Sequence, residues 1–397
     1  MKKTLNAIFL LSGTAIGSGM LSLPLVLAKI GVIPSVLVIL MFCGLTYFSA
    51  LARVELNLQS NQENTLEKVG LIFSGPKVAW LGNFSLKILM FALLAAYLYG
   101  LSSIIQSTFF QEMALAKIVI IISVLLFLLI ISSPRVLLDL NKYAIVGLLL
   151  MVISVVAIMV QHFRPETIIH VPCEIKTFSV WSMILPIIFT SFGFQGSLHS
   201  LTKICNNDIK LLKIACLWGS IIPAVVYVIW TCSVICLLNA KFPESFNKNV
   251  EVSELINLLS VACNWGFVKT LLLAISATAI ATSIFGVGLC LKDDFHTFFS
   301  KILDRKASIG VSCLCTVIPG CFIAIFVPNA FIHVLSFAGM LLVVIAIFIP
   351  MFLLGKVQQS FKFKALNSKF IMSNLLFIGI AISVCEIYNI FTCGLFK

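Results

Sequence analysis

The sequence has few charged side chains. Asp, Glu, Lys and Arg make up 11% of its 397 residues, and only 15 residues are acidic. Ordinary soluble domains are about one quarter charged. Hydrophobic residues reach 60% and the mean hydropathy is +1.13. Apolar runs of about 20 residues, enough to cross a bilayer, recur along the chain. This composition excludes a soluble domain and predicts an all-α polytopic membrane protein.

Sequence motifs for phosphate or metal chemistry are also missing. The chain has no GxxxxGK[ST] phosphate loop and no HExxH metal motif. Its 13 cysteines lie mostly in apolar segments, where they act as small hydrophobic residues. Cys173 and Cys263, in loops, could pair, although nothing requires it. We therefore expect no enzyme activity, no catalytic residue, no metal and no cofactor.

The apolar segments predict about eleven transmembrane helices. They lie at about Leu5–Ala28, Ser35–Leu56, Val78–Thr108, Leu115–Ile131, Ala144–Val160, Trp181–Leu201, Ile214–Leu238, Trp265–Leu291, Ser308–Phe326, Phe331–Leu354 and Phe370–Phe391. We expect one transport domain over residues 1–397, with two repeats at about 5–160 and 181–354 and an extra helix at 370–391. The polar stretch 57–77 predicts an interfacial helix on the inner face.

The basic residues predict the orientation. The net charge of +12 comes from Lys and Arg in short loops, which indicates topology and no nucleic-acid partner. A cytoplasmic N-terminus places about eighteen basic residues inside and about eight outside, in agreement with the positive-inside rule. With eleven spans, the C-terminus is then periplasmic.

The first predicted span has a glycine-rich interruption at Gly13-Thr14-Ala15-Ile16-Gly17-Ser18-Gly19. Glycine favours a helix break, and the polar groups freed by a break inside a membrane must face a cavity or a polar ligand. Alternatively, Gly13 and Gly17 form a GxxxG packing face in an unbroken helix. A second polar, glycine-rich stretch at residues 190–197, in the sixth span, favours the break. Interrupted segments at corresponding positions of two halves are typical of a transporter binding site.

Two such breaks would carry opposite electrostatic poles. The half-helix that begins near Ser18 offers free N–H groups and the positive end of its dipole to a carboxylate. The half-helices that end near Thr14 and Thr190 offer carbonyls to an ammonium, so the pair fits an α-amino acid. The candidate substrate-binding residues at the breaks are Gly13, Thr14, Ala15, Gly17, Ser18, Gly19, Met20, Phe189, Thr190, Ser191, Phe192, Gly193, Phe194 and Gln195.

Other polar residues inside spans have two interpretations. Thr282 and Ser283 could line the cavity or bind a cation, or their hydroxyls could bond their own helix. Tyr97 could face the cavity or simply pack. Lys87 is a coupling candidate because a charge inside a span is costly, although it is close enough to the inner end to snorkel. Glu386 lies in the last span, outside the repeats, where we expect it to pair rather than to take part in transport.

The stretches Gly13–Pro24 and Phe189–Ser197 closely resemble the aromatic amino-acid permeases. These are tyrosine- and tryptophan-specific bacterial carriers of the amino acid–polyamine–organocation superfamily, and the likeness is greatest to the tyrosine-specific members. The resemblance covers most of the chain, including the stretch 281–286. It implies a LeuT-type 5+5 inverted repeat with broken helices 1 and 6, proton-coupled symport and a location in the bacterial inner membrane. The chain departs from its relatives at Gln195, where they often carry His, and at Lys87.

The predicted function is import of an aromatic L-amino acid, tyrosine or tryptophan, with protons by alternating access across the lipid bilayer. Two alternatives are a sodium-coupled amino-acid carrier and, from another class, an ion channel or receptor. Gln195 has two interpretations. It could hydrogen-bond the ring hydroxyl or the indole N–H of the substrate, or it could satisfy backbone groups at the break. Nothing in the sequence indicates an oligomeric state.

We expect reporter domains fused after Lys210 or Lys362 to report a cytoplasmic position, and those fused after Pro172 or Lys248 to report an external one, because the positive-inside rule fixes the orientation. Reporter enzymes active on only one side of the membrane measure this directly. A cytoplasmic signal after Lys248 would overturn the eleven-span arrangement.

Overall fold

The structure is a computed structural model that describes residues 2–17, 19–60, 65–132, 134–160, 166–169, 173–242, 252–263, 266–327, 330–357 and 360–394. It is 90% helical, and no strand occurs in these ranges. The helices are α1 (Lys2–Ala15), α2 (Gly19–Leu27), α3 (Val32–Gln59), α4 (Leu66–Phe73), α5 (Pro76–Phe109), α6 (Leu115–Ser132), α7 (Pro134–Val160), α8 (Glu166–Ile169), α9 (Phe178–Ser191), α10 (Leu198–Ile204), α11 (Ile209–Lys241), α12 (Val252–Cys263), α13 (Gly266–Phe299), α14 (Arg305–Phe326), α15 (Ala330–Val343), α16 (Ile349–Leu354) and α17 (Lys369–Asn389).

Eight helices of the described chain are long and apolar enough to span a bilayer. The helix pair α1–α2 bends by 51° at its break and would make a ninth span. Shorter apolar stretches occur at Leu115–Ile131 in α6 and Val146–Met159 in α7. The prediction of an all-α, multi-pass membrane protein is therefore confirmed, and α4 occupies the polar stretch where the sequence predicts an interfacial helix.

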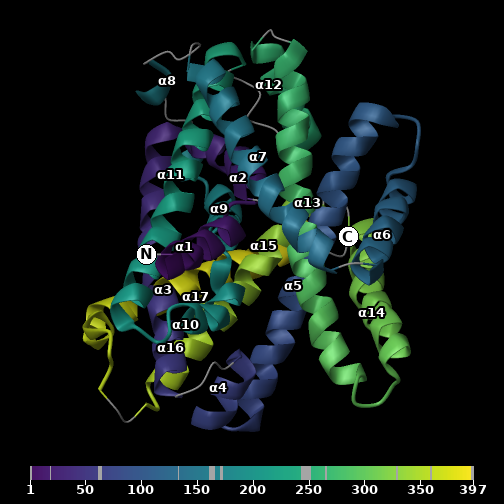
Figure 1. Ribbon diagram of the computed structural model, residues 1–397. Helices are drawn as coiled ribbons and strands as arrows, with labels where there is room; N and C mark the ends of the chain where they lie inside the picture. The colour runs from purple at the N-terminus through teal and green to yellow at the C-terminus, as the bar shows by residue number, and fades with distance from the viewer. Residues whose placement is uncertain are drawn as a thin grey trace.

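The bundle has two ends, which we call the α4 end and the α12 end after the helices that lie there (Figure 1). The long helices α5 and α13 pack against each other, and both contact α14. Helix α11 packs against α1, α2 and α3. By the sequence prediction, the α4 end is cytoplasmic.

Helix α17 shows how the core is built from one face of an apolar helix. Its buried residues include Leu375, Gly379, Ile382, Glu386 and Asn389, spaced by three or four positions. This spacing places them on one face of a helix. That face packs against α9 and α15, whereas Phe370 and Phe377 on other faces are largely exposed, as suits contact with lipid.

A buried carboxylate fastens the loop before α17 to α3. The carboxylate of Glu55 accepts the backbone N–H groups of Lys362 and Phe363, both at 3.0 Å, and the side-chain amide of Gln59 at 2.7 Å. Three donors satisfy a charge that would otherwise be costly to bury. This contact fixes the α4 end of α17 to the bundle.

Candidate substrate site between two broken helices

Both predicted interruptions are breaks in the structure. Helix α1 ends at Ala15 and α2 begins at Gly19, whereas α9 ends at Ser191 and a short 3₁₀ turn, Phe194–Ser197, leads into α10. The first break lies within the predicted interruption but is shorter than it, because α1 continues through Gly13 and Thr14 to Ala15. Ser18 lies outside the described residues.

One tyrosine from α11 joins the two breaks. The hydroxyl of Tyr227 lies 2.6 Å from the carbonyl oxygen of Ala15 and 2.7 Å from that of Ser191. These are the last residues of α1 and α9, whose carbonyls have no partner within their own helix. A hydroxyl carries one proton, so Tyr227 shares it between two acceptors. Each carbonyl keeps a lone pair that could accept another donor, such as an ammonium.

Further contacts hold α2 in place beside α9. The indole N–H of Trp230, also on α11, donates to the carbonyl of Met20 at 2.6 Å. The Ser22 and Ser191 hydroxyls lie 3.4 Å apart. On the other side of the first break, the hydroxyls of Thr14 and Ser197 lie 3.0 Å apart. The two broken helices therefore contact each other on both sides of their breaks.

The glycines at the first break allow close approach between helices. A Cβ atom on Gly19 would lie 2.5 Å from the Tyr227 hydroxyl and 2.7 Å from Cβ of Ser191. A Cβ atom on Gly17 would lie 2.7 Å from the hydroxyl of Ser283 on α13. Protein atoms, and not only a substrate, thus disfavour a side chain at Gly19, whereas at Gly17 the close atom is a serine hydroxyl that can move aside.

A cavity of about 460 Å³ opens toward the α4 end from the second break. Gln195 and Gly196 line it beside the break, and α5 contributes Lys87 and Met90. Other lining residues come from α3, α13 and the π-helical turn Val344–Phe348, namely Arg53, Cys290, Asp293, Asp294, Thr297 and Ile345. This cavity connects the break to a charged rim.

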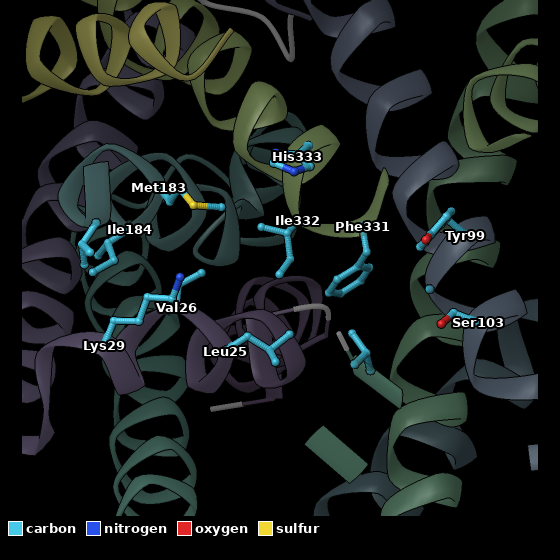
Figure 2. Close-up of a pocket in the computed structure, with 13 residues that line it drawn as sticks. Leu25, Val26, Lys29, Tyr99, Ser103, Met183, Ile184, Phe331, Ile332 and His333 are labelled. Atoms are coloured by element: carbon cyan, nitrogen blue, oxygen red, sulfur yellow. The ribbon is translucent and has the colours of Figure 1, made fainter. Parts of the chain in front are cut away.

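A smaller cavity, of about 130 Å³, lies toward the α12 end. Figure 2 shows Leu25, Val26 and Lys29 on one side of it, Met183 and Ile184 on another, and Tyr99 and Ser103 on a third. Phe331, Ile332 and His333 of α15 also line it. Helices α2 and α9 therefore border the α12-end cavity, whereas the 3₁₀ turn that follows α9 borders the α4-end cavity.

The aromatic residues near the second break are packed in the core. Phe192 and Phe194 are fully buried, and the Phe192 ring meets the Tyr227 ring edge-on at 5.3 Å. Phe189 is also fully buried and contacts the Phe42 ring. Tyr97 is buried, whereas Tyr99, two residues later, lines the α12-end cavity.

The hydroxyls of α13 and of the last turn of α9 bond backbone carbonyls. Thr282 and Ser283 both donate to the carbonyl of Ala279 at 3.0 Å, which is the intrahelical arrangement considered in the sequence analysis. Thr190 donates to Pro186 in its own helix and to Leu335 of α15, at 2.9 and 3.0 Å. Gly193 donates its N–H to the Thr190 carbonyl at 2.9 Å.

Gln195 has one satisfied and one unsatisfied end. Its amide nitrogen donates to the hydroxyl of Ser49 at 3.2 Å, and Ser49 in turn donates to the carbonyl of Ala346 at 2.7 Å. The side-chain oxygen makes no hydrogen bond, although the residue is only 8% exposed. A buried acceptor without a donor costs free energy. It therefore suits a ligand that brings a donor into the α4-end cavity.

Lys87 forms an ion pair at the rim of the same cavity. Its ammonium lies 3.1 Å from the Asp294 carboxylate of α13 and 5.5 Å from the centre of the Phe295 ring. The two charged side chains are 33% and 47% exposed. Both reach water, which explains how a lysine is tolerated in this span.

Sequence reasoning missed the residues that hold the breaks together. Tyr227 and Trp230 lie three positions apart in an apolar helix. The one signal in the sequence is that a buried tyrosine hydroxyl or tryptophan N–H usually has a hydrogen-bond partner. Asp294 was missed because it follows the end of the predicted eighth span. Cys263 is a free thiol, and the side chain of Cys173 lies outside the described residues. Among the described residues, no cluster of His, Cys, Asp or Glu could hold a metal ion.

A comparison with family profiles matches residues 1–386 to the tryptophan/tyrosine permease family. The chain belongs to this family. Its members are permeases, so this chain is a membrane transport protein and not an enzyme. The resemblance found in the two break motifs is thereby confirmed.

Curated relatives cover nearly the whole chain. Tyrosine-specific transport system 1 of Haemophilus influenzae is 27% identical over 365 residues, covering 91% of this chain and 90% of its own. Glutamine transporter 2 of Aliivibrio fischeri is 26% identical, with 88% of each chain covered. The tryptophan-specific transport protein of Shigella flexneri is 24% identical, covering 98% of this chain and 95% of its own.

Solved structures show the fold alone. A variant of the manganese transporter of Eremococcus coleocola superposes with a TM-score of 0.60 and 13% sequence identity. The match covers 97% of this chain and 85% of that one. The likeness at this identity places the permease among transporter folds and carries no information on its substrate.

We expect Gly19→Ala to reduce the initial rate of substrate uptake by roughly fivefold or more, because overpacking costs about 1–3 kcal/mol and here displaces Tyr227 from the breaks. Uptake into cells, normalised to protein in the membrane, measures the loss. The matched control is Gly286→Ala on α13, where an added Cβ meets no atom within 4 Å. Equal uptake by the two variants would show that close approach at Gly19 is dispensable.

Proposed function

We propose that this permease imports an aromatic L-amino acid, tyrosine or tryptophan, together with protons by alternating access. The observation that carries the proposal is the contact between two broken helices, with one cavity toward each end of the bundle. Alternating access needs such a site, reachable from one side and then from the other. An amino-acid substrate is supported by the poles at the breaks, where α2 begins and α1 and α9 end.

The eleven-span, LeuT-type arrangement is part of this proposal. The breaks fall in the first and sixth predicted spans, which would open two five-span repeats of opposite orientation. In this proposal the bent pair α1–α2, the eight long helices and the apolar stretches of α6 and α7 are the eleven spans, and the third short apolar helix, α12, does not cross the bilayer. We further propose that the protein lies in the bacterial inner membrane with its N-terminus cytoplasmic and its C-terminus periplasmic.

The relatives favour an aromatic substrate, but they also make glutamine a second candidate. The names of several relatives specify tyrosine or tryptophan, whereas one of similar identity is a glutamine transporter. Within this chain, the choice of substrate depends on what can fill the α4-end cavity beside Gln195. About 460 Å³ accommodates an aromatic ring, and Met90 offers it an apolar contact.

Gln195 is our candidate for recognition of the ring. Its unpaired oxygen can accept the phenol hydroxyl of tyrosine or the indole N–H of tryptophan, and neither donor exists on phenylalanine. Because its amide nitrogen is held by Ser49, the oxygen is oriented before a substrate arrives. A site built to hydrogen-bond a substrate group discriminates strongly against an analogue that lacks that group.

We assign Lys87 to closure of the cavity rather than to carrying the proton. Its ion pair with Asp294 connects α5 to α13 across the rim, where both partners still reach water. Such exposed pairs are worth little in isolation. They therefore break readily when the two helices move apart, as opening toward the α4 end would require.

The decisive experiment is uptake of labelled tyrosine, tryptophan, phenylalanine and glutamine into proteoliposomes containing the purified protein. Proton and sodium gradients are imposed separately, and empty liposomes are the control. We expect accumulation of tyrosine or tryptophan under the proton gradient alone. Accumulation driven only by sodium would favour the sodium-coupled alternative, preferential accumulation of glutamine would reject the aromatic substrate, and ion conductance without accumulation would favour a channel.

We expect Gln195→Leu to weaken tyrosine and tryptophan by about 2–10-fold relative to phenylalanine, because one neutral hydrogen bond contributes about 0.5–1.5 kcal/mol. Competition between labelled and unlabelled amino acids in the same liposomes gives the three relative affinities. Gln111→Leu, at an exposed position outside both cavities, is the matched control. An unchanged ranking in Gln195→Leu would confine this residue to its contact with Ser49.

A further inference from the structure

A carboxylate lies buried where α17 meets α9 and α15. Glu386 is 1% exposed and accepts hydrogen bonds at one oxygen from the hydroxyl of Ser336 on α15 and, at 3.3 Å, from the side-chain amide of Asn389. It faces the bundle, on the same side of α17 as Leu375 and Ile382. An acidic group at this depth in a membrane protein calls for a functional explanation.

Hydrogen bonds from neutral groups satisfy Glu386 in the structure. In the part of the chain that it describes, no Lys, Arg or His forms an ion pair with this carboxylate, contrary to the pairing role expected from the sequence. The titratable and polar groups placed against it are Cys385 and Asn389 of α17 and Ser336 of α15, and Ser182 of α9 bonds Asn389 in turn. His333 lies one helical turn before Ser336 on α15. The elements α3 and Val344–Phe348 also pack against α17 and give Glu386 no hydrogen bond.

Two routes connect Glu386 to α9, one made of hydrogen bonds and one that also passes along the backbone of α15. Through Asn389 it reaches Ser182, which exchanges two bonds with Asn389 at 2.7 and 2.8 Å. Through Ser336 it reaches the neighbouring residue Leu335, whose carbonyl accepts the hydroxyl of Thr190. Thr190 stands next to Ser191, where α9 breaks and meets Tyr227. The charge on Glu386 therefore acts on the helix that forms half of the substrate site.

The α12-end cavity lies beside these connections. His333 lines it and stands one helical turn before Ser336 on α15, so the two residues share a helix face. Met183, next to Ser182 on α9, lines it as well (Figure 2). Water in this cavity would therefore be separated from the Ser336 hydroxyl, which binds Glu386, by about one turn of α15.

We propose that Glu386 is the residue that carries the coupled proton, loaded from the α12-end cavity past His333 and Ser336. This inference rests on the proposed proton-coupled transport. In each cycle one proton leaves water at the α12 end, converts the carboxylate to the neutral acid, and leaves to water on the other side, which restores the carboxylate.

The two protonation states impose different hydrogen bonds. The ionised carboxylate only accepts, which matches the donors presented by Ser336 and Asn389. The neutral acid has a proton of its own to donate, so it needs an acceptor that the ionised form does not need. If that proton is on the oxygen that Ser336 and Asn389 bond, one of these donors must turn away or become an acceptor. Ser336 belongs to α15, and Asn389 bonds Ser182 of α9. A change in either bond therefore shifts the contacts that position α9 at its break. A buried site with two discrete arrangements is what coupling requires.

The test is Glu386→Gln, which keeps the shape of the side chain and cannot ionise. In proteoliposomes we expect it to lose accumulation of tyrosine under a proton gradient and tyrosine-induced proton entry, and to retain exchange of labelled for unlabelled tyrosine without a gradient. Glu254→Gln, at an exposed carboxylate in the first turn of α12, is the matched control and should behave as the unmodified protein. Accumulation at the unmodified level, or equal loss of accumulation and exchange, would overturn the proposal.

A second variant decides the question if Glu386→Gln does not fold. Ser336→Ala removes a donor to the ionised carboxylate, so the midpoint of the pH dependence of uptake should move upward by about one pH unit. An unmoved midpoint would overturn the proposal. The unmodified protein in the same assay tests the proposed function by itself, because absence of proton-driven uptake there rejects proton coupling before any variant is compared.

Discussion

The structure depends on how freed backbone groups are satisfied inside a bilayer. Lipid offers no hydrogen bonds, so the carbonyls at the ends of α1 and α9 need partners from within the protein. A single hydroxyl, that of Tyr227, lies within bonding distance of both. Trp230, one turn further along α11, holds the carbonyl of Met20 in α2. Helix α11 is therefore the support against which both broken helices are set.

The contacts around the site differ between its α12-end side and its α4-end side. Toward the α12 end, α2 is fully buried and is held by Trp230 and by the close approach of Gly19 to α9 and α11. Toward the α4 end, the larger cavity separates the second break from a rim of exposed charges. The weaker contacts lie at the rim, where solvent screens them. The contacts around α2 are thus buried, whereas those at the rim are open to solvent.

The features that could be predicted from the sequence are those that depend on short segments of the chain. Glycine clusters revealed both breaks, and hydropathy revealed the spans, because backbone freedom and apolar length are properties of short segments. The sequence could not predict the partners of Tyr227, which lie 212 and 36 positions away in the chain. Nor could it tell that Phe192 and Phe194 are packed in the core, since an apolar residue looks the same in a core and in a pocket. For Glu386, the spacing on α17 was readable, but the absence of an ion-pair partner among the described residues was not.

Helix α17 is attached to the bundle in an unusual way for so apolar a segment. Lipid is as apolar as its leucines and phenylalanines, so close packing and polar contacts, rather than the hydrophobic effect, hold it against its neighbours. Besides its packing on α9 and α15, it has a buried carboxylate at each end: Glu55 of α3 holds the loop before its first turn, and Glu386 bonds Ser336 near its last turn. Because both carboxylates are almost completely buried, the polar contacts at the two ends of this helix are shielded from water and from lipid headgroups alike.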